Sequence, residues 1–195
     1  MHAGVSPTEV SGCNRFEITG TDARAFLTRM VCGTLPKRER RVGLPYLLNH
    51  RGMVKSEATI ATLPPGHTGS ARIWQGSAAA SEGHDMDWLT QHIRPDDDVQ
   101  IHSLTNRWTM LVLAGPNSRD VLRAASRGDW SADAFPRLSV RDAIVGIAPA
   151  VVMVVSHSGE TAFEIHLPNA QLLAAWRALR AAGEGHGLRL IGARA

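Results

Sequence analysis

The segment LLNHRGMVKSEATIAT, residues 47–62, predicts a β-hairpin, because the dipeptide Arg51-Gly52 separates two strand-like runs. Its second strand sets a single acid, Glu57, among small and apolar residues. Two orientations stay open for a carboxylate in such a strand. It can face water and be inert, or it can enter a pocket, where burial raises the pKa of a carboxylate and favours proton exchange near neutrality. The apolar pattern predicts buried side chains at Met53, Val54, Ala58, Ile60 and Ala61, and solvated side chains at Lys55 and Ser56.

Length and composition predict an ordinary globular protein. The chain has 195 residues, of which 44% are hydrophobic and 20% charged, enough to build a core in one large domain or two small ones. The formal net charge of +3 is spread along the chain, apart from one basic cluster at residues 37–41. This cluster lacks the aromatic or glycine interleaving of nucleic-acid binders, so no nucleic-acid partner is expected. It is interpreted as a solvated loop, with the tail of an anionic ligand as the alternative.

Cysteine and histidine positions predict neither a disulfide nor a metal site. The spacing of Cys13 and Cys32 matches no redox or zinc motif. His84 and His92 share a helical face with Trp88 but have no obvious third ligand, so they are interpreted as surface histidines. The N-terminus lacks the apolar core of a secretion signal, and no apolar run approaches the roughly 18 residues of a membrane span. These observations predict a cytoplasmic protein without a membrane partner.

Strand and helix signals alternate along the chain and predict an α+β fold with mixed sheets and flanking helices. We expect residues 1–12 to be loosely ordered and residues 13–195 to form a single domain. Strands are predicted over residues 15–19, 71–74, 99–104, 108–114 and 161–166, with two more in 143–156 separated at Pro149. Helices are predicted over residues 23–32, 78–93, 119–125 and 170–182.

The run AFEIH, residues 162–166, holds the second acid of interest. Strand alternation sets Phe163 and Ile165 on one face, and Glu164 on the other with Ala162 and His166. A carboxylate held in this way can bind a guanidine-like edge, such as that of an aminopteridine, through two hydrogen bonds. The alternative is a solvated glutamate on a strand.

Several blocks of the sequence occur together in the order of a known family: EITGTDARAFLTRMVCGTL, YLLNHRGMVKSEATIA, LAGPNSRDVL, AFPRL, HSGETAFEIHLP and GLRLIGARA. From about residue 8 onward, the chain resembles the aminomethyltransferase family. This family includes the glycine-cleavage T-protein and the folate-binding half of dimethylglycine and sarcosine dehydrogenases, and the dehydrogenase branch is the most similar. The blocks are weak singly, and their shared order is what makes the resemblance specific.

The resemblance implies a tetrahydrofolate site. Glu57 matches the family's functional acid beside the N5 and N10 nitrogens of the folate, and Glu164 matches the acid that binds the pterin edge. The other positions implied to line or contact the folate are Leu47, Leu48, Asn49, Trp74, Gly76, His157 and Arg194.

The implied activity is transfer of an aminomethyl or methylene group to tetrahydrofolate, or N-demethylation. FAD is expected only on a partner flavin amine oxidase or dehydrogenase. Alternatives are a non-catalytic subunit similar to the gamma chain of sarcosine oxidase, and a fold reused to bind another small molecule. Departures from the family pattern motivate them: His157 replaces a tyrosine, Ser56 an aspartate and Met53 a glycine, and the sequence reaches Ala195 before the family's C-terminal barrel. That truncation also implies a surface covered by a partner or a second copy.

Overall fold

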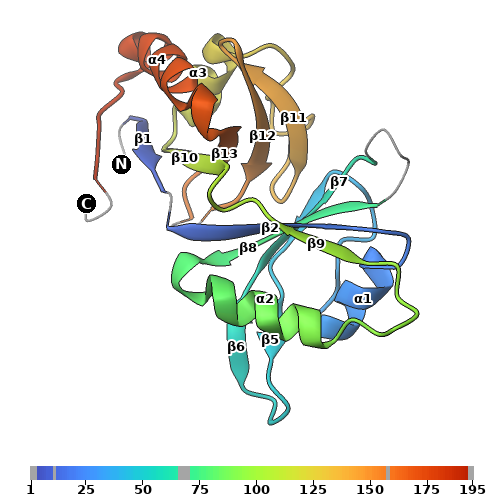
Figure 1. The fold of residues 1–195 in the computed structure, drawn as a ribbon. Coiled ribbons are helices and arrows are strands. Elements are labelled where there is room, and N and C mark those ends of the chain that lie inside the picture. The colour runs from blue at the N-terminus through green and yellow to red at the C-terminus, as the bar shows by residue number, and fades with distance from the viewer. Residues whose placement is uncertain (1–3, 11, 66–70, 157–158, 193–195) are drawn as a thin grey trace. The chain divides into compact units, whose positions relative to one another are not determined.

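The computed structural model describes residues 4–10, 12–65, 71–156 and 159–192 and has the α+β fold predicted from the sequence (Figure 1). The chain divides into two compact units. Unit 1 combines Met1–Ser11 with Asn106–Ala195, and unit 2 comprises Gly12–Thr105. The single domain expected over residues 13–195 stays a prediction, and each unit is described by itself.

Unit 1 is a five-stranded antiparallel sheet with two helices packed on one face. Its strands lie in the order β1 (Ser6–Glu9), β10 (Trp108–Ala114), β13 (Ala162–Pro168), β12 (Ala148–Val154) and β11 (Val140–Val145). The helices are α3 (Ser118–Ala125) and α4 (Leu172–Gly183). Alternate strand residues such as Leu111 and Ile165 form one apolar core with Leu122 and Leu179 of the helices. The opposite alternate positions therefore carry Glu164 and His166, as the alternation in AFEIH predicted.

The N-terminal segment is more ordered than expected. Ser6–Glu9 forms strand β1 and pairs antiparallel with β10, with Ser6 opposite Ala114. Val5 is buried in the core of unit 1 and forms a bridge with Leu188. The prediction of a loosely ordered segment is therefore wrong for residues 5–9, because a polar sequence such as SPTE can be held by backbone pairing alone.

Over residues 12–65 and 71–105, unit 2 forms two sheets and two α-helices. The larger sheet has the order β4 (Arg41–Gly43), β7 (Thr59–Leu63), β8 (Arg72–Ala78), β2 (Cys13–Thr19) and β9 (Gln100–Ser103). The smaller sheet has the order β3 (Val31–Cys32), β5 (Tyr46–Leu48) and β6 (Val54–Glu57). Helices α1 (Ala23–Met30) and α2 (Glu82–Gln91) contribute Phe26, Leu27 and Leu89 to an apolar core with Phe16 and Ile60.

The predicted hairpin is present, but its burial pattern differs from the expectation at the tip. Ala58, Ile60 and Ala61 are buried as predicted. Met53 and Val54 are instead 58% and 59% exposed, and Ser56 is buried. A register shift pairs Leu47 with Ser56 but Leu48 with Val54, so Lys55 is an additional residue in β6. This bulge interrupts the alternation of side chains between the two faces of β6, and the side chain of Ser56 therefore points inward.

Two element boundaries also differ from the sequence prediction. The helix predicted over residues 23–32 ends at Met30, because Val31 and Cys32 pair with Leu47 and Tyr46 in the smaller sheet. Pro149 lies inside β12 rather than between two strands, and the chain turns at Gly146, where φ is +63°. Pro149 can lie there because β12 pairs with β13 only from Val151 onward.

Cys13 and Cys32 are not joined in a disulfide. Among the helices of the described residues, none combines the length and apolarity needed to cross a membrane.

Candidate functional site

The residues implied by the family resemblance are distributed over both units. Unit 1 holds Glu164, while His157 and Arg194 fall outside the described residues. Unit 2 holds Leu47, Leu48, Asn49, Glu57, Trp74 and Gly76.

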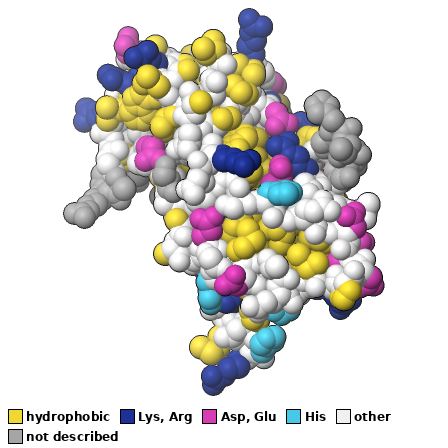
Figure 2. All heavy atoms as spheres, viewed as in Figure 1, with side chains coloured by type: hydrophobic (Ala, Val, Ile, Leu, Met, Phe, Trp, Pro, Cys, Tyr) yellow, Lys and Arg dark blue, Asp and Glu magenta, His cyan; other side chains and the backbone are white. Residues whose placement is uncertain are grey.

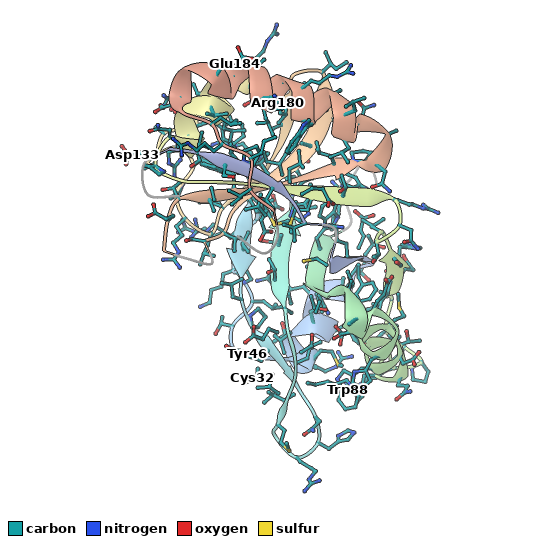
Figure 3. All side chains as sticks on the ribbon, turned by 90° about the vertical axis from the view of Figure 1, so that its left-hand side faces the viewer. Cys32, Tyr46, Trp88, Asp133, Arg180 and Glu184 are labelled. Atoms are coloured by element: carbon teal, nitrogen blue, oxygen red, sulfur yellow. The ribbon has the colours of Figure 1, made fainter. Side chains whose placement is uncertain are left out.

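Glu57 is the last residue of β6, and its side chain is exposed. It pairs with Tyr46 of β5, which in turn pairs with Cys32 of β3. Residues directly opposite each other in antiparallel strands present their side chains on the same face. The outer face of the smaller sheet therefore carries a carboxylate, a phenol and a thiol in one row, and Figure 3 shows Cys32 and Tyr46 close together. Of the two orientations open to Glu57, the structure has the solvated one.

The inner face of the hairpin meets a buried polar cluster centred on Asp85 of α2. Asp85 is fully buried, and its Oδ2 accepts hydrogen bonds from the Ser56 hydroxyl at 3.1 Å and the Ser77 hydroxyl at 2.6 Å. Asn14 Nδ2 lies 2.7 Å from Ser77 Oγ and 3.4 Å from the same carboxylate oxygen. One carboxylate thus connects strands β2, β6 and β8 to α2.

Sequence reasoning missed this cluster. In the helix predicted over residues 78–93, Met86, Leu89 and Ile93 share one face; Leu89 is fully buried and the other two pack against the core. Asp85 precedes Leu89 by four residues, so the helical period puts it on the same face. That spacing was a usable signal, but an acid in a helix is usually solvated.

Leu47, Leu48 and Asn49 have structural roles in unit 2. Leu47 is fully buried in the apolar core, while Leu48 and Asn49 are half-buried. Asn49 Oδ1 accepts hydrogen bonds from the backbone N–H groups of Arg51 and Met53, at 2.9 and 3.1 Å. This side chain closes the hairpin turn, in the way that Asx turns do.

Trp74 and Gly76 lie on the face of the larger sheet opposite the helices, beside Glu17 of β2. Trp74 is buried, and its indole N–H donates to Glu17 Oε1 at 3.0 Å. Arg72 Nε donates to the same oxygen at 2.6 Å. Gly76 adds no side chain between Arg15 and Thr59, its partners on the neighbouring strands.

The Glu17 group predicts acid-sensitive stability. Burial raises the pKa of the Glu17 carboxyl. Hydrogen bonds from Arg72 and Trp74 and the charge of Arg72 lower this pKa by more than burial raises it, so the net pKa lies below its ordinary value of 4.5. A carboxyl with a lowered folded-state pKa stabilises the fold above its unfolded pKa, and this contribution is lost as the pH falls through the folded value.

We expect Glu17→Gln to be less stable than wild type at pH 7. The difference should shrink below about pH 4.5 in urea titrations. Glu39→Gln, in an exposed loop, is the control and should follow wild type at every pH; a constant difference for Glu17→Gln would contradict the linkage.

An aromatic and imidazole cluster lies where the hairpin meets α2. The Trp88 ring centroid is 4.4 Å from that of His92 and 5.0 Å from that of His50. Lys55 Nζ lies 4.8 Å from the Trp88 centroid and 2.7 Å from His84 Nε2. His84 is exposed, as predicted. Figure 2 shows imidazole and basic side chains gathered at this hairpin end of unit 2.

Metal ligation is not suggested by this arrangement. Within residues 4–10, 12–65, 71–156 and 159–192, no three His, Cys, Asp or Glu side chains are grouped closely enough to hold an ion.

Glu164 in unit 1 is a buried acid, with 5% of its surface exposed. His166, two residues along β13 on the same face, is 6% exposed, and its Nε2 lies 3.2 Å from Glu164 Oε2. The solvated alternative for Glu164 is therefore wrong. A buried carboxylate beside an imidazole is suited to receive the N–H groups of a planar, guanidine-like ligand edge.

Comparisons with known proteins agree with the arrangement of strands and helices. The solved aminomethyltransferase T of the glycine cleavage system from Bartonella henselae superposes with a TM-score of 0.78 at 19% identity, covering 97% of this chain and 48% of that chain. A chain of heterotetrameric sarcosine oxidase from Corynebacterium sp. U-96 superposes with a TM-score of 0.72 at 16% identity, covering 95% of this chain and 86% of that chain. These structural matches show the fold alone.

Sequence relatives include sarcosine oxidase subunit alpha of Rhizobium meliloti, 30% identical over 94% of this chain and 19% of the relative. Human mitochondrial dimethylglycine dehydrogenase is 28% identical over 96% of this chain and 21% of the relative. The aminomethyltransferase of Chlorobium phaeobacteroides is 30% identical over 94% of this chain and 49% of the relative. The chain thus spans between about a fifth and a half of these relatives. The family model of the GCVT N-terminal domain matches residues 1–195, and the chain therefore belongs to this family.

Proposed function

We propose that this chain is a tetrahydrofolate-dependent one-carbon transfer domain that works with a flavin amine oxidase or dehydrogenase. The observation that supports it best is the exposed Glu57 carboxylate, on a strand whose neighbouring residues are fixed by hydrogen bonds. The family resemblance implies that this residue is the functional acid. Tetrahydrofolate supplies the two nitrogens, N5 and N10, that take up the one-carbon unit.

The role of Glu57 in this proposal is to accept the proton that leaves N10 and to stabilise nearby positive charge. An iminium made by the flavoprotein carries the one-carbon unit. Tetrahydrofolate, when bound, would take up that carbon on its two nitrogens, and the two protons lost from them would finally reside on the released amine. Glu57 is suited to carry the N10 proton because its carboxylate is exposed on the outer face of the smaller sheet. A negative charge beside a cationic intermediate also lowers the energy of that intermediate.

Glu164 has the binding role in this proposal. Its buried carboxylate presents acceptor oxygens, and an aminopterin edge presents neighbouring N–H donors. Hydrogen bonds to an ionised acceptor contribute about 1.5–3 kcal/mol each. The residues present therefore fit the chemistry of the ligand.

Glu164→Gln is expected to weaken tetrahydrofolate binding by about tenfold, because the amide keeps one acceptor oxygen and loses the charge. Isothermal titration calorimetry with tetrahydrofolate measures this dissociation constant. Glu184→Gln is the matched control, since Glu184 is an exposed acid of the same unit (Figure 3). An unchanged dissociation constant for Glu164→Gln removes Glu164 from the binding site. The absence of binding by the wild-type protein removes the folate function altogether.

A second candidate function is a non-catalytic subunit of a flavoprotein complex. Its support is the Corynebacterium sarcosine oxidase chain, which this chain covers over 86% of its length, whereas the aminomethyltransferase T structure is covered over 48%. Co-purification with an FAD-containing protein, without tetrahydrofolate binding in calorimetry, supports this function. Binding of tetrahydrofolate by the chain alone favours the first function.

A further inference from the structure

We propose that Asp85 is a positioning residue, which fixes the outward direction of Glu57 by holding Ser56 on the inner side of β6. This inference rests on the proposed role of Glu57. Its structural basis is the contact between successive residues of β6 and successive residues of α2.

Two consecutive residues of β6 are bound to two consecutive residues of α2. Lys55 Nζ lies 2.7 Å from His84 Nε2, and Ser56 Oγ lies 3.1 Å from Asp85 Oδ2. The indole of Trp88, one turn further along α2, receives the Lys55 ammonium at 4.8 Å from its centroid. The strand is therefore held by α2 over the two positions that directly precede Glu57.

The position after Glu57 is fixed as well. The backbone N–H of Ala58 donates to the Pro45 carbonyl at 3.0 Å, and Ala58 itself is buried. Successive side chains of a strand point to opposite faces. With Ser56 and Ala58 both directed inward, Glu57 must be directed outward, beside Tyr46. The backbone of Glu57 is thus constrained on both sides while its carboxylate is exposed.

The burial of the Asp85 carboxyl has a high cost, which makes a simple packing role a poor explanation. Asp85 is fully buried, and its Oδ1 has no hydrogen-bond partner among the described residues. A buried acceptor without a partner is unfavourable. Ser77 and Asn14 already hydrogen-bond each other at 2.7 Å, so β2 and β8 are joined without Asp85. The Ser56 contact is what Asp85 adds to the hairpin.

The test compares Ser56→Ala with Ser77→Ala. Both serines are buried, 8% and 9% exposed, and both donate to Asp85 Oδ2, but only Ser56 adjoins Glu57. Amide hydrogen exchange followed by mass spectrometry reports the opening of each strand. Ser56→Ala should increase exchange in peptides that cover residues 54–58 by about tenfold, which corresponds to the loss of one hydrogen bond. Ser77→Ala should leave the exchange of these peptides within about twofold of wild type, and Ser56→Thr, which keeps the hydroxyl, should restore it.

Kinetics supply a second readout. If Glu57 transfers a proton, Ser56→Ala should lower kcat by about tenfold with KM for tetrahydrofolate unchanged, while Ser77→Ala should leave both parameters near wild type. Equal exchange of residues 54–58 in Ser56→Ala and wild type overturns the proposal, and so does an equal increase in both alanine variants. Faster exchange in Ser56→Ala alone, with no folate binding by wild type, retains the role of Asp85 and removes only the proposed function.

Discussion

Glu57→Gln is expected to lower the rate of methylene transfer to tetrahydrofolate by about 10²–10⁴-fold, the usual contribution of a general base. The amide cannot accept the N10 proton and carries no charge to stabilise a cationic intermediate. The dissociation constant for tetrahydrofolate should stay within about threefold of wild type, because Glu164 carries the proposed binding role. An iminium generated in place by a flavin enzyme acting on sarcosine is a suitable substrate. The rate of the uncatalysed reaction of tetrahydrofolate with free formaldehyde is measured separately and subtracted.

Asp96→Asn provides the control for this experiment. It removes one exposed carboxylate from the same unit, in a loop, and should leave the rate unchanged. A Glu57→Gln protein that is as fast as wild type contradicts the catalytic role of Glu57. Loss of tetrahydrofolate binding in Glu57→Gln would instead assign the carboxylate to ligand binding.

Arg119→Met is expected to lower the free energy of unfolding of unit 1 by about 2–4 kcal/mol, because carbonyl groups of one loop lose their donor. The Arg119 guanidinium donates to the carbonyls of Trp130 at 2.5 Å, Ser131 at 3.2 Å and Phe135 at 3.2 Å. Its Cζ also lies 5.2 Å from the centroid of Phe163. Burial, and then the charge of Arg123, lower the pKa of Arg119, but an arginine stays charged at neutral pH.

Arg123→Met is the matched control, one turn along the same helix. Arg123 forms an exposed ion pair with Asp120, a type of contact that contributes about 0.5 kcal/mol or less. Urea unfolding gives the free energies, and amide exchange over residues 130–136 tests whether the loop opens. Equal stability losses in the two variants would show that the carbonyl contacts of Arg119 contribute nothing beyond a surface charge.

Patterns local in the sequence predicted much of the fold. The apolar run of residues 108–114 coincides with β10, and the alternation in AFEIH correctly set Glu164 and His166 on one face of β13. Both depend only on the period of two along a strand. The family resemblance then gave roles to Glu57 and Glu164, which the strand patterns had singled out without deciding whether each is solvated or faces a pocket.

The Asp85 cluster shows where local patterns fail. The hydrogen-bond partners of Asp85 lie 71, 29 and 8 residues away in the sequence, at Asn14, Ser56 and Ser77. No period links these positions, since they come together only when three strands and a helix have assembled. The extra residue at Lys55 could not be predicted from local patterns either, because a register shift depends on how the partner strand pairs with β6. Burial was consequently mispredicted for Met53, Val54 and Ser56.

The bulge at Lys55 also bears on self-association by strand addition. In the smaller sheet β6 is an edge strand, and the apolar side chains of Val54, its first residue, and of the adjacent Met53 are exposed. A flat, apolar outer strand is a template for pairing with another chain and hence for aggregation. The additional residue interrupts the regular ladder of N–H and C=O groups, and its ammonium adds charge at that point. The hairpin can thus present apolar side chains to a partner while β6 resists extension of the sheet by a second copy.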